Sequence, residues 1–172
     1  HKHGHVIAKY HKAGDREIQM AIEAAKRAHD NWNSQHWTTR ALIMLKIAQL
    51  ITVKYRAKLN AATMLGQSKN IYQSEIDAIC ETADFLRFNV YFASEIYKTQ
   101  PLSSFNQLNR MEYRALEGVV FAVSPFNFTA IASNLNLSPV MMGNTTVWKP
   151  ASTSLLSNYY LMEIFMEAGL PA

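Results

Sequence analysis

The spacing of apolar residues gives the first hundred residues a helical character. Apolar positions recur every three or four residues from about Asp15 to His29, from about Thr38 to Arg56 and on to Gly66, and from about Ser74 to Tyr97. The clearest stripe consists of Ile76, Ile79, Ala83, Leu86, Val90, Ala93 and Tyr97. We expect helices in these ranges, with Asp15 capping the first and Gly66 ending the second. The last range also fits a coiled coil, but a long helix packed on a domain is the favoured interpretation.

From residue 119 onward the pattern alternates between strands and helices. Val119–Val123 is a continuous apolar run, which is typical of a buried parallel strand, and Thr145–Trp148 is a second, β-branched strand. Helices are expected from Phe128 to about Leu137 and from about Ser152 to Ala168. The turn and cap residues that agree with these bounds are Gly143-Asn144, then Ser152 or Thr153, and finally Gly169 with Pro171.

Two weaker strand patterns lie outside this unit. Val6–Tyr10 has the composition of a short strand, and Met111–Arg114 alternates like an edge strand of a β-hairpin. Together with the strands and helices after residue 119, they predict an α/β fold. We expect a short strand and a helical layer over about 1–100, and a β-hairpin with a βαβα unit over about 110–172.

The order of strand, helix, strand and helix makes the two strands of the βαβα unit parallel. Their carboxyl ends therefore meet at one edge of the sheet, and ligands of open α/β sheets bind outside that edge. The residues at these ends are Ser124-Pro125-Phe126-Asn127 and Lys149-Pro150. Two segments that are distant in the sequence are thus predicted to line one crevice.

The chemistry of these ends suits a negatively charged or hydroxyl-rich ligand. The Asn127 amide can donate a hydrogen bond to an oxygen that gains negative charge, and such a donor lowers a barrier by roughly 3–4 kcal/mol. Lys149 can hold a ribose or a phosphate. Taken alone, each residue is better explained structurally, Asn127 as a turn or N-cap asparagine and Lys149 as a solvated strand-end lysine. The sequence contains neither a G-x-G-x-x-G fingerprint nor a P-loop, so the interpretation rests on the convergence of the two ends.

Composition narrows the classes of function. The chain has 172 residues, is 49% hydrophobic and 17% charged, and carries a formal charge of +4 that is spread thinly. These values are typical of a globular protein and do not indicate a nucleic-acid-binding surface. There is no apolar run as long as a membrane span and no signal-peptide pattern. The sequence begins without Met and stops just after a predicted helix, so it has the pattern of a chain cut at both ends, and we expect further structure to follow residue 172.

The single cysteine and the six histidines add little chemistry. Cys80 cannot form a disulfide within the chain, which fits a reducing compartment, and its position in a helix predicts a small core thiol. His1, His3 and His5 would share one face of a strand, but no cysteine or carboxylate cluster accompanies them. Because a structural zinc site needs four converging ligands, we expect no metal site.

Two motifs together resemble the aldehyde dehydrogenase superfamily. They are Pro125-Phe126-Asn127-Phe128 and Gly143-Asn144-Thr145-Thr146-Val147-Trp148-Lys149-Pro150. A narrower resemblance, to the Δ1-pyrroline-5-carboxylate dehydrogenases, rests on four segments: Glu117–Ile131, Gly66–Lys69, Glu75–Ala78 and Asp84–Asn89. The likeness runs from about residue 3 to the end of the chain and matches the first part of the family's length.

The resemblance implies N-terminal helices packed on the first part of a Rossmann-like parallel sheet, as an incomplete NAD(P)-binding domain. It implies NAD-dependent oxidation of L-glutamate γ-semialdehyde to L-glutamate, the last step of proline breakdown, through a cysteine thiohemiacetal and thioester. The family's nucleophilic cysteine, its glutamate base and its catalytic domain would lie beyond residue 172. Cys80 matches no nucleophile motif, so we expect the segment alone to be inactive.

The resemblance also assigns roles to individual residues. Asn127 would stabilise the oxyanion, and Lys149 would hold the adenosine ribose in a pocket shaped by Pro150. Phe128 would lie beside the aliphatic part of the aldehyde, and Glu81 is either near the substrate channel or a helix-surface carboxylate. The remaining cofactor-binding positions are Ser124, Pro125 and Phe126 on the nicotinamide-ribose side and Ser152 near the 2′-hydroxyl.

Further expectations concern specificity, assembly and location. Ser152 is neutral where many NAD-preferring members carry a glutamate, so use of NADP is compatible with the sequence. Ser133–Leu137 is bulkier and more polar than the small-residue stretch expected after the Phe-Asn-Phe motif. The family implies a homo-oligomer that acts on a small aldehyde, in the mitochondrial matrix of a eukaryote or otherwise in the cytoplasm. The alternatives are another aldehyde dehydrogenase and a non-catalytic structural protein with the same fold.

Overall fold

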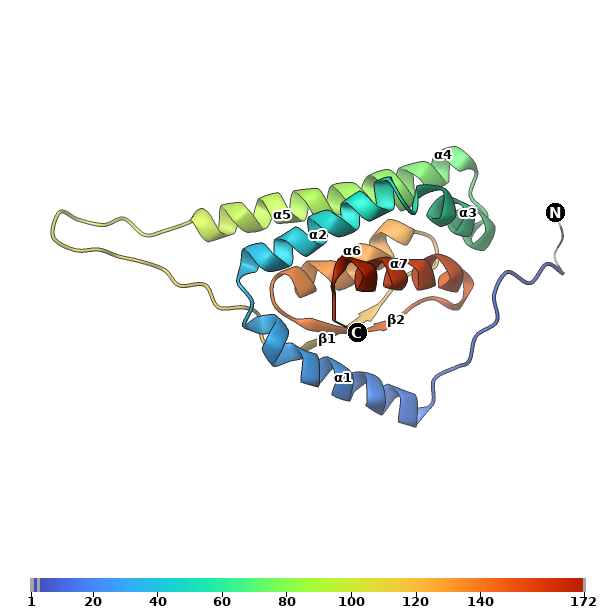
Figure 1. Cartoon of the computed structure of the whole chain (residues 1–172), viewed down its shortest axis with the longest axis horizontal. Coiled ribbons are helices and arrows are strands. Elements are labelled where there is room, and N and C mark those ends of the chain that lie inside the picture. The colour runs from blue at the N-terminus through green and yellow to red at the C-terminus, as the bar shows by residue number, and fades with distance from the viewer. Residues whose placement is uncertain (1, 3, 172) are drawn as a thin grey trace.

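Figure 1 shows a computed structural model of the chain, which describes residue 2 and residues 4–171. The sheet strands are β1 (Val119–Val123) and β2 (Thr145–Lys149). The helices are α1 (Asp15–Asn33), α2 (Trp37–Thr52), α3 (Arg56–Gln67), α4 (Ile71–Ser74), α5 (Thr82–Lys98), α6 (Thr129–Met141) and α7 (Leu155–Ala168), with a π-helical segment η1 (Glu75–Glu81) and a 3-10 turn η2 (Ser152–Ser154).

The two strands form a parallel sheet, as the sequence predicts. Their register runs from Val119 opposite Thr145 to Val123 opposite Lys149, and α6 makes the crossover between them. Helix α1 packs on one side of the sheet, and α6 contacts both strands from the other side (Figure 1). The βαβα unit and the mixed α/β fold are therefore confirmed.

A helical layer covers α6 and α7 on the side away from the sheet. Helix α2 packs against α5 and α7, α5 against α6, and α3 against α7 (Figure 1). The core between the layers holds fully buried apolar side chains such as Met44, Ile47 and Leu161, each of which contributes roughly 1.5–3 kcal/mol through burial. Trp32 extends the core to α1, and its indole N–H donates to the Val140 carbonyl at 2.8 Å. No helix among the described residues combines the length and the apolar character needed to cross a membrane.

Helix boundaries differ from the prediction around α3. The helix expected up to Arg56 ends at Thr52, and a new helix begins at Arg56. Gly66 is the penultimate residue of α3 and does not end it, because Ser68 takes the left-handed conformation with φ 53°. A Cβ added at Gly66 would lie 3.4 Å from the Thr153 carbonyl oxygen, so this glycine marks a close approach to η2.

The predicted cap of the last helix is wrong. Ser152 and Thr153 belong to η2, and α7 begins only at Leu155. The Ser154 hydroxyl donates to the Ala151 carbonyl at 3.3 Å and does not cap α7, so the 3-10 turn leads directly into this helix. The predicted end is confirmed, since Gly169 has φ 111° just after Ala168.

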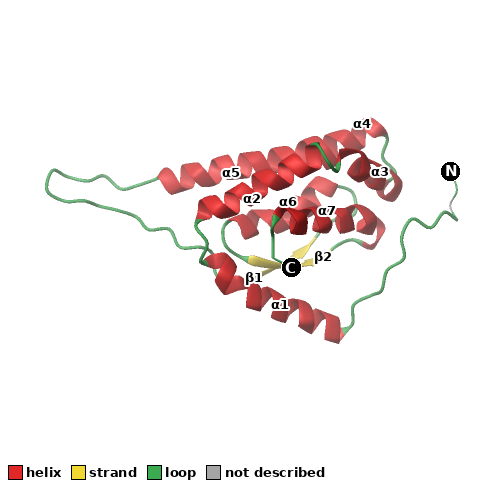
Figure 2. Ribbon diagram, in the orientation of Figure 1, coloured by secondary structure: helices red, strands yellow, loops and turns green. Residues whose placement is uncertain are grey.

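Neither weak strand pattern forms a strand. Val6–Tyr10 and Met111–Arg114 are both irregular (Figure 2). The amide of Met111 donates to the Gln100 side chain at 2.9 Å, so a local side chain takes the place of a neighbouring strand. The segment between α5 and β1 projects away from the body of the molecule (Figure 1). An alternating pattern needs a partner backbone to become a strand, and this segment pairs only at an isolated bridge between Ser104 and Gln107 within the part of the chain that the structure describes.

Strand β1 is less buried than its apolar run predicts. Ala122 is 4% exposed, whereas Phe121 is 67% and Val123 is 52% exposed. Within the described residues β1 is hydrogen-bonded to β2 along a single edge. Alternate side chains of a strand point to opposite faces, so Phe121 and Val123 share one face of β1, and that face is less covered than the face that carries Ala122.

Candidate active site at the ends of the parallel strands

The segments after β1 and β2 lie side by side. The amide of Ser124 donates to the Lys149 carbonyl at 3.3 Å, which continues the parallel pairing by one residue. The indole N–H of Trp148 donates to the Ser124 hydroxyl at 2.9 Å. The two strand ends that the sequence brings together are therefore adjacent in space.

The predicted site residues differ in how far solvent reaches them. Asn127, Lys149 and Ser152 are exposed, Phe126 is 66% exposed, and Pro125 and Pro150 are half-buried. Ser124 is 3% exposed and its hydroxyl is occupied by Trp148, so it can offer a ligand little more than backbone. The Asn127 amide and the Lys149 ammonium make no hydrogen bond to another described residue, which leaves both donors free for a ligand.

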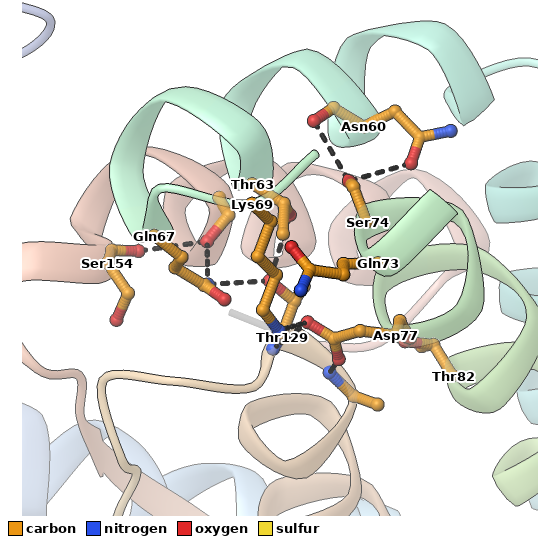
Figure 3. A network of polar contacts seen from close by, with 12 residues as sticks. Asn60, Thr63, Gln67, Lys69, Gln73, Ser74, Asp77, Thr82, Thr129 and Ser154 are labelled. Carbon is orange, nitrogen blue, oxygen red and sulfur yellow. Dashed lines mark hydrogen bonds and ion pairs between the residues drawn. The ribbon is translucent and has the colours of Figure 1, made fainter. Parts of the chain in front are cut away.

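A remote carboxylate holds the start of α6, directly after Asn127. The two Asp77 oxygens accept hydrogen bonds from the amides of Thr129 at 3.0 Å and Ala130 at 2.8 Å (Figure 3). Asp77 is 1% exposed and lies on η1, 52 residues from Thr129 in the sequence. Free amides and the positive end of the helix dipole make a helix start favourable for a carboxylate.

Lys69 connects this carboxylate to the Phe128 ring. Its ammonium lies 2.6 Å from an Asp77 oxygen and 4.1 Å from the centroid of the Phe128 ring. The Lys69 side chain is 14% exposed, so both contacts are shielded from bulk water. An ammonium over an aromatic face is attracted by the ring, and the attraction grows as water is removed.

Hydroxyl and amide groups continue the anchor behind Thr129. The Thr129 hydroxyl is 2.9 Å from that of Thr63 and accepts from the Gln67 amide at 2.8 Å (Figure 3). The same Gln67 amide reaches the Ser157 hydroxyl on α7 at 3.3 Å. Helix α3 therefore holds the first residue of α6 directly, and Gln67 connects this contact to α7.

Glu81 lies at the end of η1, one turn beyond Asp77, and is half-buried. Desolvation raises the pKa of its carboxyl, the charge of Asp77 raises it further, and Lys69 lowers it. The charges of both Asp77 and Lys69 therefore act on the Glu81 carboxyl. It is thus neither a surface carboxylate in free solvent nor a member of the hydrogen-bonded anchor.

The π-helical segment η1 explains why Asp77 is buried and why the prediction of a buried Cys80 is wrong. Residues Asp77, Ala78 and Ile79 are buried, whereas Ile76, predicted on the apolar stripe, is 64% exposed. Cys80, predicted as a core thiol, is exposed. The wider turn shifts the buried face, and the Thr82 hydroxyl donates to the Asp77 carbonyl at 3.2 Å across five residues. From Ile79 onward the predicted stripe is correct.

Sequence reasoning missed Lys69, Asp77 and Thr129 as parts of the site. The sequence offered one signal, which is that Asp77 lies directly beside the predicted apolar stripe. A carboxylate that is buried there requires partners, so its presence points to contacts with other parts of the chain. Helical spacing placed Asp77 away from the core, and no local pattern connects it with Thr129. These residues could be found only from their contacts.

Two other features lie apart from the convergence point. A cavity of about 480 Å³ is lined by apolar side chains of α1, β2 and α7, and Pro150 is the one predicted site residue that borders it. His1 and His3 lie outside the described residues. Within the described residues, no three histidine, cysteine or acidic side chains gather as a metal site would require.

The whole sequence, residues 1–172, matches the aldehyde dehydrogenase family. The chain belongs to this family. The structure agrees with the match, because the Phe-Asn-Phe and Lys-Pro motifs follow the two parallel strands and meet at one edge of the sheet. The resemblance found in the motifs and the expected fold class are both confirmed.

Similar proteins carry consistent names. A probable Δ1-pyrroline-5-carboxylate dehydrogenase of Schizosaccharomyces pombe is 54% identical over 99% of this chain and 31% of its own length. The mitochondrial Δ1-pyrroline-5-carboxylate dehydrogenase of Homo sapiens is 46% identical over 98% of this chain and 30% of its own length. The chain thus spans about a third of the length of the curated relatives it matches.

A solved structure agrees in fold. The Δ-pyrroline-5-carboxylate dehydrogenase of Mycobacterium tuberculosis bound with NAD superposes with a TM-score of 0.88 at 48% identity. The match covers 91% of this chain and 29% of that protein. The arrangement of helices around the parallel strands is therefore shared with a dehydrogenase that binds NAD.

Proposed function

We propose that this chain forms the N-terminal, cofactor-binding part of an NAD-dependent Δ1-pyrroline-5-carboxylate dehydrogenase, which oxidises L-glutamate γ-semialdehyde to L-glutamate in proline breakdown. The observation that carries the proposal is the free Asn127 amide, held between an anchored helix start and the end of β2. The names of the relatives support the substrate and the pathway.

The residues present fit NAD. The exposed Lys149 ammonium can donate to ribose hydroxyls, and the half-buried ring of Pro150 offers an apolar surface beside it. The backbone from Ser124 to Phe126 would border the nicotinamide side at the neighbouring strand end. Bound NAD⁺ supplies the hydride acceptor. Ser152 is exposed and neutral, so this position carries no carboxylate that would repel a 2′-phosphate, and use of NADP is compatible with it.

Asn127 would act on the aldehyde itself. When a nucleophile attacks the carbonyl carbon, the carbonyl oxygen gains negative charge, and the Asn127 amide would donate to it. The nucleophile in this proposal is a cysteine outside residues 1–172, because the exposed Cys80 lies on η1 and matches no nucleophile motif. Phe128 would contact the aliphatic part of the substrate, and Glu81 would lie near its entry.

The proposal includes assembly and location. Apolar and aromatic side chains are exposed on α5 and the projecting segment after it, among them Phe88, Phe92, Leu102 and Phe105. Exposed apolar surface of this kind supports a homo-oligomer. Eukaryotic relatives are named mitochondrial, which supports the mitochondrial matrix as the location in a eukaryote.

Absorbance at the NADH band tests the proposal in the complete protein that carries this chain. We expect NADH to form with glutamate semialdehyde at a kcat/KM at least about tenfold above that with succinate semialdehyde or propanal. A preference for another aldehyde would replace the substrate assignment and retain the family chemistry. Absence of NADH with all three aldehydes would support a non-catalytic protein with the same fold.

A further inference from the structure

The residue that would stabilise the oxyanion has no anchor of its own. Asn127 is exposed, and its amide donates to no other described residue. Its orientation therefore depends on the backbone on either side. Before it, the Ser124 amide is tied to Lys149; after it, the Thr129 and Ala130 amides are tied to Asp77.

The second of these ties does not come from α6 itself. The N-cap residue is Phe128, whose side chain has no oxygen with which to accept the free amides of the first turn. Asp77 accepts two of them from a different helix, with one oxygen for each amide. The position of the α6 start, and with it the backbone that carries Asn127, is thus set by η1.

A buried carboxylate can serve in this way only if its charge is balanced. Asp77 is 1% exposed, and Lys69 provides the opposite charge at 2.6 Å. Lys69 also covers the Phe128 ring at 4.1 Å. The pair therefore holds the residues on the C-terminal side of Asn127 through both backbone and side chain.

We propose that Asp77 and Lys69 are positioning residues, which aim the Asn127 amide at the aldehyde oxygen by fixing the start of α6 and the Phe128 ring. This inference rests on the proposed function, since it assigns them to the oxyanion donor of that reaction. Neither residue touches the substrate; each acts through the segment between β1 and α6. Placement matters because a fixed donor lowers a barrier without having to reorganise during the reaction.

A double-mutant cycle between Asp77→Asn and Asn127→Ala tests the coupling in the complete enzyme. Asp77→Asn is expected to lower kcat about tenfold, a part of the loss from removing an oxyanion donor, with the KM for NAD⁺ within about twofold of wild type. In the Asn127→Ala background the same substitution is expected to change kcat less than about twofold, because the group that it positions is gone. Equal losses in both backgrounds would show a general structural effect and overturn the inference.

Controls separate this role from loss of folding. Asp84→Asn, on the exposed side of α5, removes a carboxylate that pairs with Arg87 in solvent and should leave kcat unchanged. If Asp77→Asn does not fold, Lys69→Met takes its place in the cycle, because it keeps an apolar stem over Phe128 and removes the charge beside Asp77. The same non-additivity with Asn127→Ala is expected for that variant.

Hydrogen exchange gives a result that does not depend on activity. Amides of residues 124–132 should exchange about tenfold faster in Asp77→Asn than in wild type and at the wild-type rate in Asp84→Asn. Unchanged exchange in Asp77→Asn would overturn the inference even if the enzyme is active. If the wild-type protein has no dehydrogenase activity but Asp77→Asn still exchanges faster than wild type, the proposed function and the catalytic purpose are overturned and the anchor remains established.

Discussion

The segments after β1 and β2 lie side by side but are held in different ways. After β1, the chain runs from the Ser124–Lys149 hydrogen bond to the amides at the start of α6, which Asp77 holds from a buried position. After β2, Lys149 is exposed, and its ammonium makes no hydrogen bond to another described side chain. The difference matches what each residue would have to do.

An oxyanion donor must point at one atom, whereas a cation that holds a ribose can meet its hydroxyls from several directions. In the proposed reaction a rigid anchor would therefore contribute more to catalysis at Asn127 than at Lys149, since only Asn127 would act on charge that develops during the reaction. The contrast indicates that the buried polar network around Asp77 and Thr129 would support the site by holding the start of α6, even though a ligand cannot reach it. Five changes test the contrast, from the largest expected effect to the smallest.

Removal of the Asn127 amide, the proposed oxyanion donor, should have the largest effect on activity. We expect Asn127→Ala to lower kcat about 10²–10³-fold, because the developing oxyanion loses a fixed hydrogen-bond donor. Steady-state kinetics with saturating NAD⁺ measure the loss. Asn106→Ala, in the exposed segment between α5 and β1, is the matched control and should keep wild-type kcat. Unchanged turnover in Asn127→Ala would remove its assigned role.

The turn between α6 and β2 should be the most sensitive to an added side chain. Gly143 has φ 112°, and an added Cβ would lie 2.5 Å from the Ala115 Cβ. Gly143→Ala should lower the free energy of unfolding by about 2–4 kcal/mol, through backbone strain and a steric clash. Gly169→Ala has nearly the same φ, 111°, with nothing within 4 Å, and should cost about 1–2 kcal/mol. Denaturant unfolding that gives equal losses would contradict the role of the clash.

Loss of the exposed Lys149 side chain should weaken the binding of the cofactor and leave the binding of the aldehyde unchanged. We expect Lys149→Ala to raise the KM for NAD⁺ about tenfold or more, as loss of a charged hydrogen bond of about 1.5–3 kcal/mol implies, while the KM for the aldehyde changes little. Lys46→Ala removes the same charge from the exposed face of α2 and should change neither. Equal increases in both KM values would argue against a cofactor contact and against the contrast between the two strand ends.

Ser68, which precedes Lys69 in the chain, should tolerate substitution by glycine but not by a β-branched residue. Ser68 has φ 53°, between Gln67 and Lys69 of the anchor. Ser68→Val should destabilise the protein by about 1–2 kcal/mol, because a β-branched side chain fits the left-handed region poorly. Ser68→Gly should be close to neutral in the same thermal-unfolding measurement. A stable Ser68→Val would mean that the bend is not constrained.

The smallest effect concerns pH. Desolvation raises the pKa of Glu81 in the folded state above the ordinary 4.5, so the charged carboxylate disfavours the fold. The proton it binds therefore stabilises the folded state fully at low pH, and this contribution is lost as pH rises through the folded pKa. Glu81→Gln should raise Tm slightly at about pH 7 and leave it unchanged below the ordinary pKa. Glu112→Gln, whose side chain is 79% exposed, should shift Tm at neither pH.

Local patterns predicted the parts of the fold that depend on neighbours in the sequence. The helical spacing from Ile79 to Tyr97, the strands that became β1 and β2, and the glycine after Ala168 are each correct. The same patterns predicted strands at Val6–Tyr10 and Met111–Arg114, where the described residues provide no partner strand. A strand requires a second backbone, and its own residues do not specify that partner.

The predicted site shows the same division. Order and polarity placed the segments after β1 and β2 together, which the Ser124–Lys149 hydrogen bond confirms. The roles of Asn127, Lys149 and Glu81 remain proposals. Ser124, predicted to line a cofactor, is buried and bonded to Trp148, because the indole reaches across from the neighbouring strand. That contact depends on strand register, which the motifs do not specify.

By itself, the amino-acid sequence determined the order of helices and strands in the second half, the edge at which their ends meet and the family to which the chain belongs. Those properties follow from apolar periodicity and from residues close together in the chain. Tertiary structure alone decided that Asp77 faces α6 while Cys80 faces solvent, because the π-helical turn rotates one inward and the other outward. It also joined Asp77 to Thr129 across 52 residues, since a buried carboxylate is stable only where folding brings donors and an opposite charge to it.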